Sequence, residues 1–154
     1  MRFVAIMLAT FMVMEGVSYV AHRFVYHGFL WILHKSHHTP RKGVFELNDL
    51  FPAFFSVIAI VFMWYSYGHP ERSDIFAATL GVTLYGVIYS TIHDLYVHRR
   101  AKLPSLNIPY LQQVKKAHMV HHMTGTEPYG LLVFFTPRHV RDAAPDEPVD
   151  ATAR

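Results

Sequence analysis

The residues in this sequence with the clearest capacity for chemistry are its histidines. Of the twelve histidines, ten fall into four short clusters, and the clusters repeat one pair of spacings, H-x4-H followed by H-x2-H-H. These ten are His22, His27, His34, His37, His38, His93, His98, His118, His121 and His122. Imidazole binds zinc, copper, iron and nickel. Because one metal ion takes about four to six ligands, ten imidazoles predict a site for two ions.

The H-x2-H-H spacing suits a helix better than the H-x4-H spacing does. Residues at i, i+3 and i+4 share one face of a helix, so His34, His37 and His38 can point together, as can the histidines of the second such motif. Residues five apart do not align on an ideal helix. The two histidines of each H-x4-H pair therefore either face different metals or lie where the helix is loosened, and the spacing leaves both open.

Carboxylates near the clusters are expected to offset the charge of two divalent ions. A metal-bound imidazole usually donates its second ring nitrogen to a carboxylate or carbonyl, which fixes the orientation of the ring. The candidates for this role are Asp94, Glu46 and Asp49. Glu15 lies inside an apolar segment, about two helical turns before His22, and is expected either to be functional or to make a structural hydrogen bond.

Other histidine chemistries fit less well. The sequence has no cysteine, which excludes a thiolate zinc site, an iron–sulfur cluster held by this chain and a disulfide scaffold. A structural zinc site needs only about four ligands. A haem held by two histidines would place them inside facing membrane spans, and none of the ten lies inside an apolar segment. His69 and His139 stand apart from the clusters and are expected to be ordinary residues.

Three long apolar segments must position these histidines. Hydrophobic residues make up 52% of the chain, and charged residues make up only 16%, against ~25% in typical soluble proteins. Segments 3–21, 50–67 and 75–92 together contain one charged residue, Glu15, and each is long enough to cross a bilayer. The sequence therefore predicts an all-α integral membrane protein with three transmembrane helices, plus cytoplasmic helices, one over 108–123, that carry the histidine-rich dimetal site.

Three crossings would bring all four clusters to one side of the membrane. The first and third clusters each begin one residue after an apolar segment ends, and the others follow on the same side. Of the 14 Lys and Arg residues, only Arg2 and Arg72 lie on the other side. Because cytoplasmic segments are enriched in Lys and Arg, we expect a multi-pass protein of the cell inner membrane, with its site on the cytoplasmic side.

The chain is predicted to form one membrane-embedded domain over residues 1–137. The apolar stretch 129–136 is too short to span a membrane, and is expected to lie in the interface or to pack on the site. The polar, proline-containing tail 138–154 is expected to be disordered.

Several stretches beyond the histidines resemble a known family. They are HHTPRKGVFELNDL at 37–50, HDLYVHR at 93–99 and AHMVHH at 117–122. These resemble the membrane fatty-acid hydroxylase superfamily of histidine-rich diiron enzymes, and within it the bacterial β-carotene hydroxylases. The similarity covers roughly residues 13–137. H-x2-H-H alone is shared with desaturases and ketolases, whereas the PRKG-to-NDL stretch is more specific.

The resemblance implies two iron ions and O2-dependent hydroxylation at carbon 3 of a β-ionone ring, which turns β-carotene into zeaxanthin by way of the mono-ol. It also implies external electrons from a ferredoxin-like donor, and the sequence itself contains no glycine-rich nucleotide fingerprint. Zinc can replace iron in purified protein, since zinc binds such ligands more tightly than ferrous iron. The alternatives are a ketolase, desaturase or lipid hydroxylase of the same superfamily, and a non-catalytic metal-binding membrane protein.

The substrate would be dissolved in the bilayer, so an entrance from the lipid is expected. Aromatic residues are candidates for its lining, although most are expected simply to face lipid or the interface. They are Phe24, Tyr26, Phe29, Trp31, Phe54, Phe55, Trp64, Tyr85 and Tyr89. The basic residues beside the histidines are expected either to dock an acidic electron donor or only to reflect membrane topology.

Overall fold

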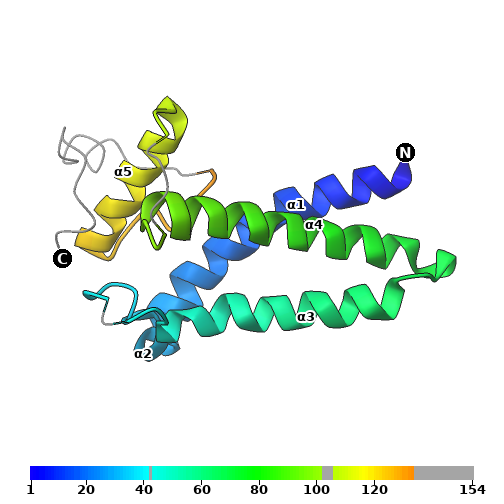
Figure 1. Cartoon of the computed structure of the whole chain (residues 1–154), viewed down its shortest axis with the longest axis horizontal. Coiled ribbons are helices and arrows are strands. Elements are labelled where there is room, and N and C mark those ends of the chain that lie inside the picture. Colours follow the sequence, from blue (N-terminus) through cyan, green and yellow to red (C-terminus); the bar gives the residue numbers. More distant parts are fainter. Residues whose placement is uncertain (42, 102–105, 134–154) are drawn as a thin grey trace.

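The computed structural model describes residues 1–41, 43–101 and 106–133, and the regular secondary structure in these residues is helical. In chain order its α-helices are α1 (Arg2–Val20), α2 (Trp31–His34), α3 (Leu50–Ser66), α4 (Ser73–Ser90) and α5 (Pro109–Thr124) (Figure 1). Three helical stretches are long and apolar enough to cross a membrane, namely Arg2–Phe29, Leu47–Ser66 and Pro70–Val97. The predicted all-α fold with three spans is confirmed. The predicted tail, 138–154, lies outside the described residues.

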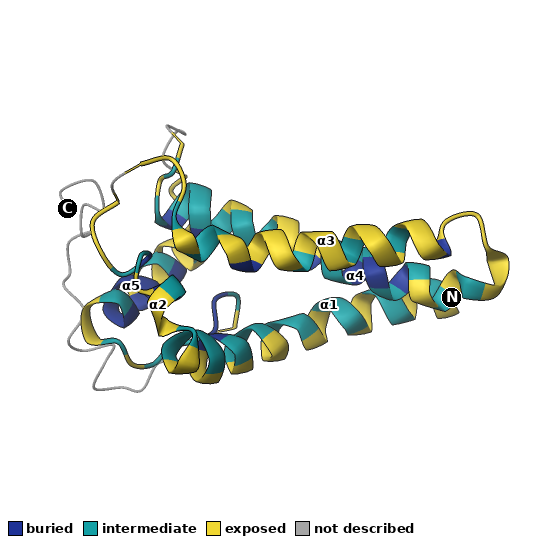
Figure 2. Ribbon diagram, turned by 90° about the horizontal axis from the view of Figure 1, so that it is seen from below, coloured by how far each residue is buried: buried dark blue, intermediate teal, exposed yellow. Residues whose placement is uncertain are grey.

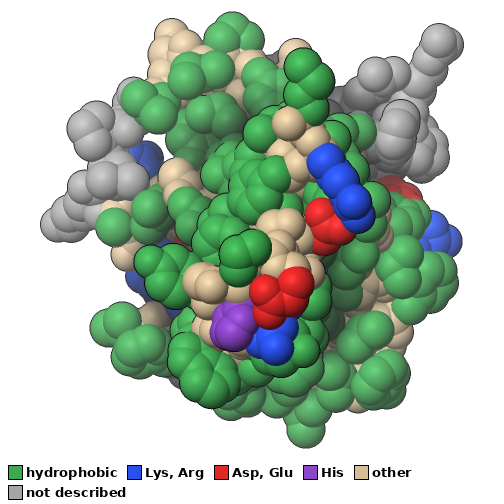
Figure 3. Space-filling view, turned by 90° about the vertical axis from the view of Figure 1, so that its right-hand side faces the viewer, with side chains coloured by type: hydrophobic (Ala, Val, Ile, Leu, Met, Phe, Trp, Pro, Cys, Tyr) green, Lys and Arg blue, Asp and Glu red, His purple; other side chains and the backbone are tan. Residues whose placement is uncertain are grey.

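The two ends of the molecule differ in kind. The N-terminus and the α3–α4 hairpin lie at one end, whereas α2 and α5 lie at the other (Figure 1). Seen from the hairpin end, the surface is mostly hydrophobic with a few charged side chains (Figure 3). At that end Arg2 pairs with Asp74, and Nδ1 of His69 lies 3.0 Å from a carboxylate oxygen of Glu71. His69 is therefore remote from the other described histidines, as expected.

The long helices present apolar side chains outward, as membrane spans do. In α1 no residue is buried, and exposed positions run along α1 and α3 (Figure 2). Many of these positions carry large apolar side chains. Trp64 is 82% exposed and Met12 is 63% exposed. A soluble protein rarely leaves such large contiguous apolar surfaces uncovered, whereas the acyl chains of a bilayer would cover them.

Helix α4 lies between the other two spans and packs against both. Its contact with α1 depends on small residues, because Ala77 is fully buried and Gly81 lies directly against the backbone of α1. A Cβ atom added at Gly81 would clash with the carbonyl oxygen of Met7 and lie 2.9 Å from Cβ of Thr10. Small residues at such crossings let two membrane helices approach closely.

The first and third spans run further than the hydropathy predicts. Instead of ending at residues 21 and 92, the helices continue as π-helical segments, Ala21–Phe29 and Thr91–Val97. The backbone N–H of His98 donates to the carbonyl of His93 at 3.0 Å, which is the i→i+5 bond of a π-helix. The H-x4-H histidines thus lie where the helix is loosened, one of the two alternatives that the spacing left open.

Beyond α5 the chain turns back toward the spans. The left-handed Gly125 ends α5, close to the predicted end at 123, and the following residues pack beside α1. Leu131 is buried in a small core with Val97, Val114 and Met119. The described part of the stretch 129–136 therefore packs on the histidine end rather than crossing the membrane.

Replacing Gly81 by Ala should destabilise the α1–α4 crossing, because the added methyl group has no space and the Met7 carbonyl must move. Overpacking of this kind costs about 1–3 kcal/mol, so thermal unfolding of the purified protein should begin several degrees lower. Gly16→Ala on α1 is the matched control, since nothing lies within 4 Å of a Cβ there. Equal melting temperatures for both variants would contradict this account of the crossing.

Candidate metal centre

The ten clustered histidines converge at the α2–α5 end of the molecule, on two points. His22, His27, His34, His38 and His121 form the first cluster, and His37, His93, His98 and His118 form the second. Within each cluster the chosen ring nitrogens lie within 4.8 Å of one another. His122 adjoins the second cluster, since its Nε2 lies 2.9 Å from Nε2 of His118. We therefore count five histidines at each point.

Each half of the chain places one histidine in the cluster that the other half mainly builds. The π-helical pair His22 and His27 joins the outer histidines of the first H-x2-H-H motif, while the middle one, His37, crosses to the second cluster. The second half mirrors this arrangement, because His121 crosses to the first cluster. Each cluster is therefore complete only when both halves of the chain are in place.

The distances between ring nitrogens fit metal ligands. Nε2 of His22 lies 3.0 Å from that of His34, Nε2 of His37 lies 3.1 Å from that of His93, and Nε2 of His98 lies 3.0 Å from that of His118. With metal–nitrogen bonds of about 2.1 Å, as in zinc–imidazole sites, ligands at right angles stand about 3.0 Å apart. If these Nε2 atoms only hydrogen-bonded to one another, several of them would face each other with their lone pairs. The donor set thus fits two metal ions.

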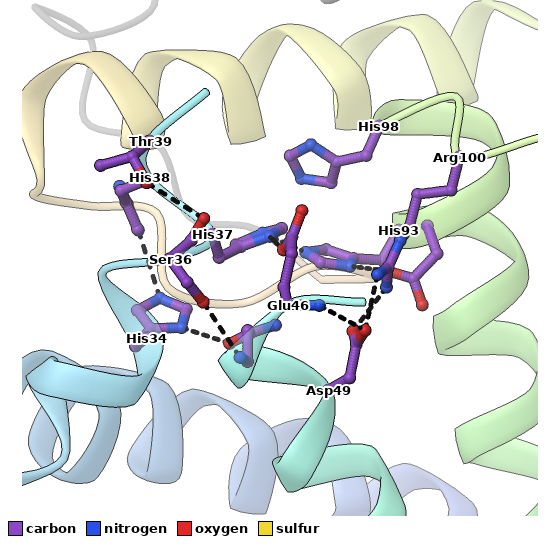
Figure 4. A network of polar contacts seen from close by, with 12 residues as sticks. His34, Ser36, His37, His38, Thr39, Glu46, Asp49, His93, His98 and Arg100 are labelled. Atoms are coloured by element: carbon purple, nitrogen blue, oxygen red, sulfur yellow. Dashed lines mark hydrogen bonds and ion pairs between the residues drawn. The ribbon is translucent and has the colours of Figure 1, made fainter. Parts of the chain in front are cut away.

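The other ring nitrogen of several of these histidines is held by an acceptor. Nδ1 of His34 donates to Oδ1 of Asn48 at 2.7 Å, and Nδ1 of His93 lies 2.9 Å from Oδ1 of Asp94. Nδ1 of His37 lies 3.3 Å from a carboxylate oxygen of Glu46 (Figure 4). Such partners fix the tautomer and aim Nε2 at the cluster centre.

In the first cluster the acceptors are mostly backbone carbonyls. Nδ1 of His22 donates to the carbonyl of Tyr129 at 2.8 Å, and Nδ1 of His121 donates to the carbonyl of Thr126. Sequence reasoning missed both, because any residue type can offer a carbonyl. It also missed Asn48, although this side chain lies between Glu46 and Asp49 in a stretch that was already singled out.

The three predicted carboxylates take different positions. Asp94 and Glu46 lie against histidines of the second cluster, as described above. Asp49 instead accepts two hydrogen bonds from Arg100, at 2.6 and 2.7 Å, and one from the backbone N–H of Glu46. Arg100 also lies 3.7 Å from Asp94. Asp49 therefore braces the loop that carries Glu46, and its predicted role at the metals remains a prediction.

Burial keeps the imidazoles outside the spans neutral. Removal from water lowers the pKa of His37 and His118 well below the usual value, and neighbouring histidines lower it further. Burial likewise lowers the pKa of His34 to about 3. Burial also raises the pKa of Glu46. Neutral imidazole is the form that binds a metal, so these rings need lose no proton at neutral pH.

An apolar cavity of about 960 Å³ ends on both clusters. Its walls are faces of α1, α3 and α4, and His22, His34 and His93 lie at its inner end. Of the aromatic residues proposed to line an entrance, five line the cavity, namely Tyr26, Phe55, Trp64, Tyr85 and Tyr89. The other four, Phe24, Phe29, Trp31 and Phe54, are exposed.

The family model named fatty acid hydroxylase matches residues 7–139, which include all ten clustered histidines. The chain belongs to the fatty acid hydroxylase family. No solved structure matches the chain. The resemblance predicted from the histidine motifs is therefore confirmed at the level of the family.

Curated relatives in this family carry similar names. The chain is 37% identical to a β-carotene hydroxylase of Pseudescherichia vulneris, over 93% of this chain and 90% of the relative. It is 40% identical to β-carotene hydroxylase 1, chloroplastic, of Capsicum annuum, over 84% of this chain. It is 39% identical to β-carotene 3-hydroxylase 2, chloroplastic, of Arabidopsis thaliana, over 89% of this chain. The aligned regions cover 42% and 46% of these two plant relatives, so the chain spans less than half of their length.

Replacing His121 by Ala should remove a ligand from the first cluster, although His121 lies on α5, the helix that carries His118 of the second cluster. We expect the protein to lose metal from the first cluster, by at least the ~10–100-fold that loss of an orienting partner costs in affinity, and to lose turnover. Elemental analysis of purified protein measures the metal content. His69→Ala at the opposite end is the matched control and should keep full metal content. Equal metal content in both variants would remove His121 from the ligand set.

Proposed function

We propose that this protein is an O2-dependent carotenoid hydroxylase of the membrane, a non-haem diiron monooxygenase. It adds a hydroxyl group to carbon 3 of β-ionone rings, converting β-carotene to β-cryptoxanthin and then to zeaxanthin. The observation that carries the proposal is the apolar cavity that runs between three membrane spans and ends on both histidine clusters. The names of the relatives support the choice of substrate.

The cavity has the size and surroundings that a long hydrocarbon needs. Its lining on α3 extends from Phe51 to Trp64, about 20 Å at the helical rise of 1.5 Å per residue. This is about two thirds of the ~30 Å hydrocarbon thickness of a bilayer. A carotenoid dissolved in the membrane could therefore enter without passing through water, with one ring at the histidine end.

Aromatic rings at the inner end are suited to hold that terminal ring. Tyr26 stacks on Phe51 with ring centroids 3.8 Å apart, and Tyr89 stacks on His93 at 5.1 Å. All four residues line the cavity. Packing between such surfaces positions a substrate C–H bond and excludes water from it.

The chemistry requires an oxidant stronger than any side chain. Two iron ions bound by the ten histidines would supply it by activating O2. The overall reaction inserts one oxygen atom into a C–H bond and reduces the other to water, consuming two electrons and two protons. The chain keeps the imidazoles neutral and excludes water from the site. It orients the rings through hydrogen bonds to Asp94, Glu46 and Asn48.

Electrons must arrive from the side of the membrane that carries the histidines. The exposed basic side chains of Lys35, Arg41, Arg99 and Lys116 lie on the segments at this end and would suit an acidic, ferredoxin-like donor. Arg100 contributes less than expected because it is engaged by Asp49. The excess of Lys and Arg also supports a cytoplasmic orientation in an inner membrane.

The direct test is to produce the protein in cells that accumulate β-carotene and to analyse the pigments by chromatography and mass spectrometry. We expect zeaxanthin together with β-cryptoxanthin. Cells that produce His121→Ala at equal abundance are the control and should retain β-carotene.

Each other product would replace this proposal with a named alternative. Ketolated rings would indicate a ketolase, and new double bonds would indicate a desaturase. Unchanged β-carotene beside metal-loaded protein would contradict carotenoid hydroxylation and direct the search to fatty acids and sterols.

The cavity itself can be tested by filling it. Ala59 lines the cavity, so Ala59→Phe should lower conversion of β-carotene about 100-fold, the scale of misplacing a substrate by about 1 Å, while metal content stays unchanged. Ala53→Phe makes the same substitution on the exposed face of α3 and should convert β-carotene normally. Equal conversion by both variants would show that the substrate does not use this cavity.

A further inference from the structure

We infer that Glu15, a carboxylate inside the first membrane span, is a positioning residue for the first histidine cluster and acts through the backbone of residues 126–133. The inference rests on the proposed metal-binding role of the clusters. It concerns a residue that lies outside all four histidine motifs and whose hydrogen bonds, within the described residues, go to Tyr85, Leu131 and Val133.

The Glu15 carboxylate is fully engaged by hydrogen-bond donors. Its Oε1 accepts from the backbone N–H groups of Leu131 and Val133, each at 2.9 Å. Its Oε2 accepts from the hydroxyl of Tyr85 on α4 at 2.7 Å. Two of the three bonds therefore attach residues 126–133, the returning segment that follows α5, to α1. This answers the question that the sequence left open, since the membrane carboxylate makes structural hydrogen bonds.

A second carboxylate fixes the other end of the same segment. Glu127 accepts hydrogen bonds from Tyr19 at 2.8 Å and from Arg23 at 2.8 Å, both on the first span. The segment from Glu127 to Val133 is thus attached to the first span at two points, with Tyr19 about one turn and Arg23 about two turns beyond Glu15. Buried Gly130 lies between the attachments, where a Cβ atom would come 3.0 Å from Oε1 of Glu15 and 2.8 Å from the carbonyl of Val133.

The attached segment lies directly against the first cluster. The Tyr129 carbonyl accepts from Nδ1 of His22, and the Thr126 carbonyl accepts from Nδ1 of His121. The Tyr129 ring also meets three histidines edge-on, with centroids 5.5 Å from His22, 5.2 Å from His27 and 5.1 Å from His121. If this segment moved, the rings of His22 and His121 would therefore lose the hydrogen bonds that orient them, and the ring of His27 would lose its packing against Tyr129.

The second cluster depends on different supports. His37 and His93 are held by side chains of Glu46 and Asp94, which lie beside Arg100 and Asp49 rather than beside the returning segment. Loss of the Glu15 attachment should consequently affect one metal ion and spare the other. A general folding defect would affect both.

Glu15→Ala tests this, because it leaves the N–H groups of buried Leu131 and of Val133 without the oxygen that accepts from both. We expect one of the two bound ions to bind ~10-fold or more weakly, measured as iron per chain during chelator competition in detergent. Gly130→Ala should have the same effect without altering any polar group. Tyr85→Phe removes only the third bond to Glu15, and should keep both ions.

Variants of the clusters assign the weakened ion. In a His27→Ala background the first cluster is already impaired, so adding Glu15→Ala should change little. In a His98→Ala background the remaining ion lies in the first cluster, so adding Glu15→Ala should weaken it. Thermal unfolding of each variant should remain cooperative.

Three outcomes would overturn the inference. They are unchanged affinity for both ions in Glu15→Ala and Gly130→Ala, equal weakening of both ions, and weakening confined to the His27→Ala background. If wild-type protein binds no metal, the proposed function fails first and takes this inference with it. If wild-type protein binds two ions and Glu15→Ala also binds both normally, only the inference fails.

Discussion

The constraint on which the structure depends is that two sets of five imidazole nitrogens must each converge on one point, next to the hydrocarbon of a membrane. Neutral rings at 3.0–3.2 Å from one another are costly to bury unless each lone pair has a cation to face. The remainder of the histidine end meets this requirement. Two π-helical segments align the H-x4-H pairs, and each H-x2-H-H motif sends its middle histidine across to the other cluster. Because of this exchange, neither half of the chain can build a complete ligand set alone.

The proposed function adds a second requirement, which is to bring an apolar substrate to a polar centre, and the arrangement of the spans suits it. Helix α4 packs on both neighbours, closely enough to need Gly81 at the α1 crossing, and the cavity lies among the three helices. The clusters therefore lie at its end rather than on an open surface. Glu15 and Glu127 attach the returning segment to α1, and that segment supplies carbonyls where the second cluster uses carboxylates.

The sequence predicts the parts of this arrangement that follow from local rules. Continuous apolar runs predict the three spans because a bilayer demands that length and composition, and the three crossings predict that the histidines meet. The spacing cannot choose between a π-helix and an α-helix for His93 and His98, because the shifted hydrogen bonds depend on what packs around the turn. The exchange of His37 and His121 depends on how two distant helices face each other. The sequence names Asp49 as a candidate for orienting a histidine, and its pairing with Arg100, 51 residues away, depends on tertiary structure that the sequence pattern does not carry. Tyr129 and Thr126 act through carbonyls, which carry no signature in residue type.

The most direct measurement is anomalous X-ray scattering at the iron edge from crystals of iron-loaded protein. The account predicts two iron peaks in each chain, one enclosed by His22, His27, His34, His38 and His121, and the other by His37, His93, His98, His118 and His122. A single peak shared by all the histidines, or two peaks whose ligands follow the chain halves without the exchange of His37 and His121, would contradict it.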